Sequence, residues 1–176
     1  MKRSLAALSA CAALLAGCVT QPPQATAPAG TPSQSPAPKP VAHVGQTLDL
    51  MRIGGQKIAV TLTEVVSPAT VPNDWGAPGK TYVATKLRIE NTGTTTIVGN
   101  SNSDVSVIGS NNETYQADFA TAVECQDFTY GWFLLAAGSS ASGCVVFALP
   151  PGVSATKVRY SPSSGISRDV GEWLNP

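Results

Sequence analysis

The sequence of 176 residues is poor in charge and in histidine. Asp, Glu, Lys and Arg make up 12% of it, with 11 residues of each sign, so no basic excess is present that would bind nucleic acid. The single histidine, His43, lies in a proline-rich stretch, which leaves no partner for a Ser-His-Asp set inside a fold. No nucleophile elbow, phosphate loop or dinucleotide fingerprint is present. These absences predict a non-catalytic protein that needs neither cofactor nor metal.

The N-terminus has the pattern of an export signal. Two basic residues at 2–3 precede an apolar run over 5–15, which is too short for a spanning helix of about 20 residues. The next residues, Leu15-Ala16-Gly17-Cys18, resemble the lipobox of bacterial lipoproteins. By that resemblance, residues 1–17 are removed and the sulfur of Cys18 receives a diacylglycerol. Two acyl chains suffice for stable anchoring, so we expect the mature chain to be held at a membrane surface outside the cytoplasm.

Residues 18–44 are predicted to form a disordered tether. They contain seven of the chain's 14 prolines and almost no large apolar side chain. Such a segment buries too little surface to offset the entropy of ordering it, and its prolines favour extended conformations. His43 falls at the end of this tether, where we expect it to have no catalytic role.

The remaining residues, 45–176, are predicted to form one domain made of strands. Apolar or β-branched residues alternate with polar ones most clearly over 82–90, and the same period of two recurs over 58–63, 105–107, 145–149 and 158–160. Clusters of Gly, Asn and Pro separate these runs, as turns require. No window of a dozen residues has helical spacing. The pattern therefore predicts an all-β fold, an antiparallel sandwich of two sheets.

Three segments give a more specific resemblance. They are Val44-Gly-Gln-Thr-Leu48, the strand and turn over 82–93 that ends Arg-Ile-Glu-Asn-Thr-Gly, and residues 135–152, a loop leading into a strand that prolines stop. Over about 44–174 the chain resembles a family of bacterial secreted lipoproteins catalogued as a domain of unknown function. The resemblance implies an immunoglobulin-like sandwich, similar in fold to a small immunogenic protein secreted by mycobacteria. It carries over no catalytic residue.

Two cysteines, Cys125 and Cys144, remain in the domain. An exported chain meets an oxidising environment in which a pair of cysteines usually bridges, and the pair is 144 − 125 = 19 residues apart. Closing such a loop stabilises a fold by about 3 kcal/mol on the chain-entropy model. Cys144 falls on the strand face opposite Phe147, which predicts a disulfide outside the main core. The absence of a CxxC spacing is evidence against a redox or metal pair.

Aromatic residues are the candidate contact residues. Rings and the carboxylates of Glu113, Asp118, Glu124 and Asp127 are mixed over residues 113–133, as in a groove for carbohydrate or peptide. The alternative is that the rings belong to the core and the acids to loop surfaces. A second irregular loop carries another ring. The possible binding surface comprises Trp75, Phe119, Phe128, Tyr130 and Trp132.

The segment Asn100-Ser-Asn102-Ser-Asp104 places oxygen-bearing side chains at alternate positions, as calcium loops do. However, Val105 stands where the turn glycine belongs, and no glutamate closes a twelve-residue loop. The segment is therefore predicted to be a polar turn between strands.

Together these observations favour a lipid-anchored extracytoplasmic protein whose non-catalytic domain contacts an envelope protein or polymer. One alternative is a small-ligand or glycan carrier, which an enclosed apolar void between the sheets would favour. The other is a carboxylate-based hydrolase using residues 113–127, which converging acids in an open cleft would favour. A flat aromatic patch would favour the partner-binding domain.

Overall fold

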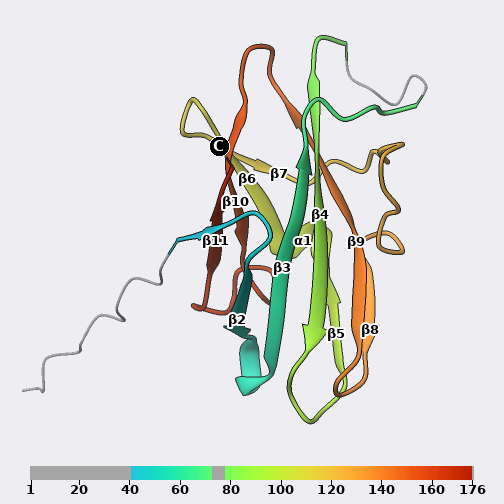
Figure 1. Ribbon diagram of the computed structural model, residues 1–176, viewed down its shortest axis with the longest axis vertical. Helices are drawn as coiled ribbons and strands as arrows, with labels where there is room; N and C mark the ends of the chain where they lie inside the picture. Colours follow the sequence, from blue (N-terminus) through green and yellow to red (C-terminus); the bar gives the residue numbers. More distant parts are fainter. Residues whose placement is uncertain (1–40, 73–77, 176) are drawn as a thin grey trace, which may run out of the picture. The chain divides into compact units, whose positions relative to one another are not determined.

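One sheet contains the strands with the clearest sequence alternation, in the order β2-β3-β4-β9 (Figure 1). The computed structural model describes residues 41–72 and 78–175. The predicted signal, Cys18 and most of the predicted tether lie outside these residues. Neighbouring strands in this sheet are antiparallel. The strands are β2 (Thr47–Met51), β3 (Lys57–Val66), β4 (Thr81–Asn91) and β9 (Ser140–Leu149).

The second sheet has the order β1-β11-β10-β6-β7. Its strands are β1 (Ala42–His43), β6 (Val105–Gly109), β7 (Thr114–Gln116), β10 (Ala155–Tyr160) and β11 (Gly171–Leu174). β1 runs parallel to β11, and the other pairs are antiparallel. The sandwich therefore begins before the predicted boundary at residue 45, because Ala42 is buried in the core and His43 lies opposite Leu174 in the sheet.

A two-stranded ribbon, β5 (Ile97–Asn100) with β8 (Trp132–Leu135), completes the strands. Directly after β5 the chain forms a single turn of helix, α1 (Ser101–Asp104), where a polar turn was predicted. Asn100 begins this helix because its Oδ1 accepts a hydrogen bond from the backbone N–H of Asn102 at 3.0 Å. A 3-10 turn, η1 (Ile53–Gly55), follows β2. Within the described part of the chain, no helix has the length and apolar character needed to span a membrane.

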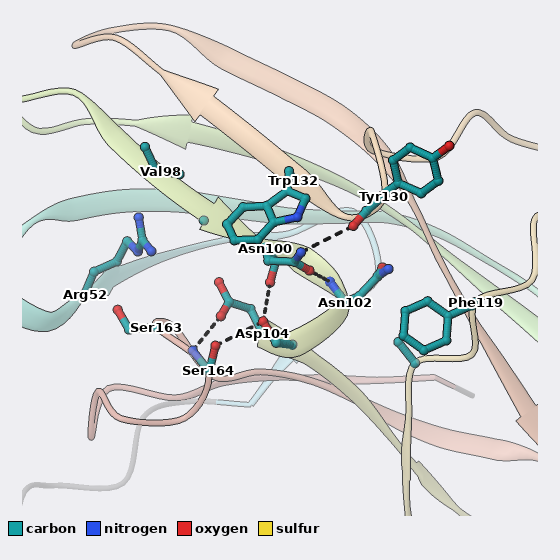
Figure 2. Close-up of a pocket in the computed structure, with 13 residues that line it drawn as sticks. Arg52, Val98, Asn100, Asn102, Asp104, Phe119, Tyr130, Trp132, Ser163 and Ser164 are labelled. Carbon is teal, nitrogen blue, oxygen red and sulfur yellow. Dashed lines mark hydrogen bonds between the residues drawn. The ribbon is translucent and has the colours of Figure 1, made fainter.

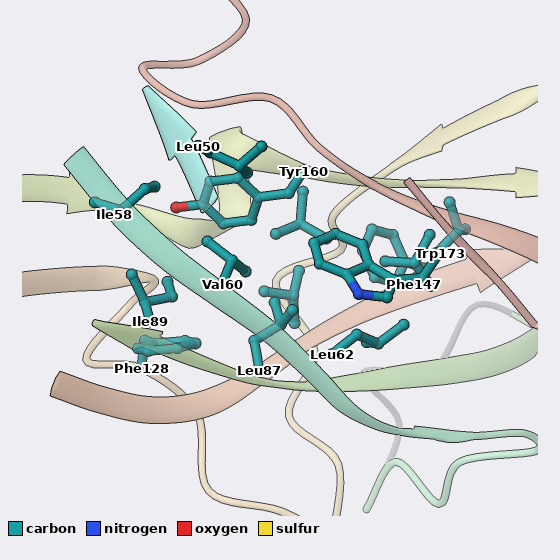
Figure 3. Close-up of a cluster of buried hydrophobic side chains, with 14 of the residues drawn as sticks. Leu50, Ile58, Val60, Leu62, Leu87, Ile89, Phe128, Phe147, Tyr160 and Trp173 are labelled. Carbon is teal, nitrogen blue, oxygen red and sulfur yellow. The ribbon is translucent and has the colours of Figure 1, made fainter. Parts of the chain in front are cut away.

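The core lies between the sheets and contains the alternating residues that the sequence pattern selects (Figure 3). In β4, Val83, Leu87 and Ile89 are buried together, as the period-two pattern predicts. The largest fully buried side chains include Trp173, Tyr160, Phe147, Ile58 and Leu62. The predicted all-β fold, an antiparallel sandwich of two sheets, is thus confirmed.

A disulfide joins Cys125 to Cys144, as the sequence predicts, with the Cα atoms 6.1 Å apart. It lies on the face of β9 opposite Phe147, because Cys125 packs against a second, smaller cluster that contains Tyr82, Ala84 and Val146. Residues 117–127 therefore cover the outer face of β4 and β9. Two isolated bridges, Asp118 with Val146 and Asp127 with Cys144, hold this covering segment to the edge strand β9.

Candidate binding groove

Two adjoining pockets lie beside the β5–β8 ribbon and share Asn102, Phe119 and Tyr130 in their walls. We call the pair the groove. The first pocket, named the Arg52 pocket, has a volume of about 480 Å³, and the second, named the Asp127 pocket, about 440 Å³. Figure 2 shows the Arg52 pocket with Arg52 and Ser163 at one end, Phe119 and Tyr130 at the other, and Trp132 and Asn100 between them.

Three of the predicted contact residues lie around the groove with their rings largely exposed. The exposed fractions are 92% for Phe119, 88% for Tyr130 and 57% for Trp132. Alternation along β8 explains the position of Trp132, because Phe133 points into the core while its neighbour points outward. Rings that could be buried but remain exposed around a hollow are typical of a contact surface.

Tyr130 is held at the tip of a strained turn. Its φ is 51° and that of Gly131 is 80°, and the N–H of Trp132 donates to the carbonyl of Thr129 at 2.9 Å. Two successive positive φ angles define a type I′ turn, in which Asn or Gly is the usual first residue. A Cβ on Gly131 would lie 2.5 Å from Oδ1 of Asn100, so the close approach also requires glycine there. The turn thus presents a tyrosine ring where a smaller residue would fit the backbone better.

Arg52 lines the far end of the Arg52 pocket from the chain between β2 and η1. Its side chain is 7% exposed, and neither Nε nor Nη1 has a hydrogen-bond partner among the described residues. The guanidinium carbon lies 5.8 Å from the centre of the Phe133 ring. Its backbone is fixed by the hydrogen bond from the Arg52 N–H to the carbonyl of Gln56 at 2.8 Å. Burying guanidinium nitrogens without hydrogen-bond partners is costly to a fold.

Asp104, at the end of α1, lines the same pocket as Arg52 and is close enough for the two charges to interact. Its Oδ2 accepts a hydrogen bond from the Tyr160 hydroxyl at 3.1 Å, and its Oδ1 accepts one from the Ser164 N–H at 2.6 Å. Burial raises the pKa of Asp104, although these hydrogen bonds and the charge of Arg52 oppose the rise. Burial and then the negative charge of Asp104 raise the pKa of Tyr160 well above its ordinary value.

Of the four acids predicted near the rings, only Asp118 and Asp127 line the groove. Oδ1 of Asp118 accepts a hydrogen bond from the Ala120 N–H, and burial raises the pKa of Asp127. Glu124 instead accepts from the Thr70 N–H, and hydrogen bonding by Thr70, chiefly by its side chain, lowers the pKa of the Glu124 carboxyl. Glu113 accepts from Asn111 and from the Tyr115 hydroxyl. Glu113 therefore stabilises its own turn, and Glu124 joins the covering segment to the loop that contains Thr70.

Phe128, the fourth ring of the predicted surface within the described residues, lines the Asp127 pocket but is buried where an exposed ring was expected. Its side chain is 4% exposed, and its ring lies over Gly143, where an added Cβ would be 2.7 Å from it. Phe128 also packs at 6.2 Å, between ring centres, against Phe133. The glycine in β9 leaves room for the ring, which draws Phe128 into the core. Trp75 lies outside the described residues, so its place in the predicted surface stays a prediction.

Sequence reasoning missed Arg52, Asp104 as a groove residue, and Asn102. Two features of the sequence could have indicated these residues. Arg52 interrupts an apolar stretch, Leu50-Met51-Arg52-Ile53, and the polar run 100–104 is long for a turn. Across residues 41–72 and 78–175, no group of three or more His, Cys, Asp or Glu is placed to hold a metal ion.

The fold and the groove define the chain as an antiparallel β-sandwich protein with two adjoining surface pockets beside the β5–β8 ribbon. Residues 45–170 match the family described as "Domain of unknown function (DUF4352)", and the chain belongs to this family. No curated protein matches the sequence.

Solved structures share the fold at low sequence identity. The secreted protein MPT63 from Mycobacterium tuberculosis is 17% identical with a TM-score of 0.60, over 80% of this chain and 100% of that one. The candidate lipoprotein ycdA from Bacillus subtilis is 12% identical with a TM-score of 0.55, over 76% of this chain and 38% of that one. The yjhA protein from Bacillus subtilis is 17% identical with a TM-score of 0.50, over 69% and 83%.

Proposed function

We propose that this protein is a lipid-anchored, extracytoplasmic binding protein that holds an envelope polymer in the groove and catalyses no reaction. The observation that carries the proposal is the exposure of Phe119, Tyr130 and Trp132 around two adjoining pockets. Exposed aromatic rings give large contact areas at a small entropic cost, and the turn at Tyr130 adds backbone strain that folding alone does not require.

The shape of the groove favours a polymer over a flat protein surface. Each pocket has the size that ordinarily holds one small molecule. Because the pockets share Asn102, Phe119 and Tyr130, successive units of one chain would occupy both of them. A protein partner instead requires an extended complementary surface, commonly about 800 Å² on each side.

The proposed location is supported by sequence and by likeness. Leu15-Ala16-Gly17-Cys18 resembles a lipobox, and two proteins that share the fold are a secreted protein and a candidate lipoprotein. Replacing Cys18 by Ala should move the protein from the membrane fraction to the soluble fraction of lysed cells. Equal membrane association of the Cys18→Ala variant would show that Cys18 is not the anchor.

Binding is tested by sedimentation of the full chain, purified in detergent, with insoluble wall polymer of the producing bacterium after protein removal. The wild type should sediment, and the variant with Phe119, Tyr130 and Trp132 all replaced by Ala should stay in solution. Val123→Ala is the matched control, because Val123 is exposed on the same covering segment and lines neither pocket.

Three other outcomes would contradict the proposal. Equal sedimentation of the triple variant would remove the groove from binding. Cross-linking of wild-type cells to one protein, lost in the triple variant and without polymer binding, would establish a protein partner instead. Release of sugar fragments from the polymer, lost in Asp127→Asn, would establish the hydrolase.

A further inference from the structure

The Arg52 pocket contains two buried guanidinium nitrogens without hydrogen-bond partners, which the binding of apolar units would not explain. Arg52 is more than nine-tenths buried, and its Nε and Nη1 have no hydrogen-bond partner in the part of the chain described. The Phe133 ring contacts the flat face of the guanidinium. The N–H groups point outward from the guanidinium edge, so the ring does not accept hydrogen bonds from them. An arginine has five N–H donors and cannot lose its charge in a protein. An acceptor that the folded chain does not supply would complete it.

Asp104 does not supply this acceptor. Its two oxygens accept hydrogen bonds from Tyr160 and Ser164, and none of its hydrogen bonds comes from Arg52. The contrast with the opposite sheet is direct, because Arg159 there donates to Glu172 from both Nε and Nη2. The fold can bond an arginine to a carboxylate on its surface, yet no carboxylate accepts a hydrogen bond from the buried Arg52.

The other residues that line the pocket indicate which chemical groups the rest of the ligand would carry. Trp132 and Val98, each 57% exposed, form an apolar rim. The Asn102 side chain lines both pockets and makes no hydrogen bond within the described residues, so its amide can both donate and accept. Serine hydroxyls of Ser103 and Ser164, which bond each other at 3.0 Å, lie on the remaining side. A ring to stack on, an amide and hydroxyl oxygens match the faces and hydroxyl groups of a sugar.

We infer that the Arg52 pocket binds a sugar unit that carries a carboxylate, with Arg52 pairing the carboxylate and Trp132 and Asn102 contacting the sugar. Arginine and carboxylate form paired, parallel hydrogen bonds of high specificity. Because Nε and Nη1 are covered in the structure, a ligand reaches them only when side chains around Arg52 move. This inference rests on the proposed function, because it names the unit of the polymer that the groove would hold.

The experiment is a titration of the full chain in detergent, observed by NMR at the Arg52 Nε–H and the Trp132 indole N–H. The probes are D-glucuronic acid and N-acetylmuramic acid, each paired with its uncharged carboxamide. We expect at least one acid to shift both signals saturably, and its carboxamide to bind about tenfold more weakly. Equal titration by acid and carboxamide, or no shift at Arg52 with either acid, would overturn the inference.

Two variants give opposite expected results, which separates electrostatics from damage to the fold. Arg52→Met keeps the length and apolar contacts of the side chain and should lose the preference for the acid over its carboxamide. Asp104→Asn removes the negative charge beside the pocket and should strengthen acid binding several-fold. Parallel losses in both variants, or tighter binding of inorganic phosphate than of either acid, would contradict a carboxylate site.

The polymer sedimentation assay distinguishes this inference from the proposed function. Arg52→Met should sediment about tenfold more weakly than the wild type. If Arg52→Met sediments normally while the triple aromatic variant does not, the groove binds polymer without a carboxylate contact, and only the inference fails. If the triple variant sediments normally, the proposed function fails whatever Arg52 does.

Discussion

On β10 and β11, Glu172 accepts a hydrogen bond from Nζ of Lys157 at 2.8 Å and from Nη2 of Arg159 at 2.7 Å. At the groove, Arg52 and Asp104 are also close enough for their charges to interact, yet no hydrogen bond joins them. The first cluster satisfies its own charges in partly exposed positions. The second cluster is buried, and two nitrogens of its arginine have no hydrogen-bond partner among the described residues.

The difference separates a structural role from a functional one. Partly exposed ion pairs such as Lys157 with Glu172 contribute about 0–1 kcal/mol each, and nothing further is needed to complete them. A buried polar group without a partner costs about 1–3 kcal/mol. A fold that bears this cost at Arg52, together with the strained turn at Tyr130, concentrates its unfavourable features around the same groove. The groove is therefore the part of the molecule where stability and function should conflict.

The largest expected effect comes from loosening the covering segment on the groove side. Replacing Cys125 and Cys144 together by Ser should lower the free energy of unfolding by about 3 kcal/mol, because the disulfide closes a loop of 19 residues. Urea unfolding measures this loss. Polymer sedimentation should weaken as well, since Phe119 lies on the segment that the bond fixes to β9. An unchanged urea midpoint would show that the bridges of Asp118 and Asp127 hold the segment alone.

A smaller effect of opposite sign is expected at the turn. Tyr130→Asn should raise the free energy of unfolding by about 1 kcal/mol, because Asn tolerates the left-handed conformation at φ 51° better than Tyr does. The same variant should bind polymer more weakly, since the exposed ring is lost. Thermal unfolding and sedimentation measure the two effects. Phe119→Ala is the control, because it removes an exposed ring without positive φ and should change stability by less than about 0.5 kcal/mol. A destabilised Tyr130→Asn variant would mean that the ring contributes to folding.

The fold could be predicted from the sequence wherever one strand face is apolar and the other polar. The alternation of Val83, Leu87 and Ile89 fixes which face of β4 enters the core. The short strands β5 and β8 were not predicted, because four residues give too little periodicity to detect. β1 was assigned to the tether for a similar reason, since two residues next to a proline-rich stretch carry no pattern of their own.

The sequence predicted the aromatic residues of the groove but neither their exposure nor the charged residues beside them. Exposed and buried rings look alike in a sequence, so Phe128 and Tyr130 received the same interpretation, although a glycine on another strand, Gly143, decides that Phe128 is buried. Arg52 and Asp104 are 52 residues apart (104 − 52) and come together only through the packing of the two sheets. Local pattern contains no information about such a pair.

The smallest expected effects are in the pH dependence of stability, and they should have opposite signs in the two charged clusters. Partial burial opposes ionisation of Glu172, but Lys157 and Arg159 lower its pKa below the ordinary 4.5. Its stabilisation is therefore present above that value and is lost as pH falls through the folded-state pKa. Glu172→Gln should cost less than about 1 kcal/mol near neutral pH, and the difference from wild type should vanish in acid.

For Asp104, burial raises the pKa above the ordinary 3.8, so the folded protein holds the proton more tightly than the unfolded chain does. Ionisation of Asp104 then lowers stability as pH rises from that value through the folded-state pKa. Asp104→Asn should consequently gain stability relative to wild type over the same range, the reverse of Glu172→Gln. Urea unfolding at a series of pH values measures both variants. If the two curves diverge from wild type in the same direction, the Arg52–Asp104 cluster is as well satisfied as the Glu172 cluster, and the contrast between the two regions is wrong.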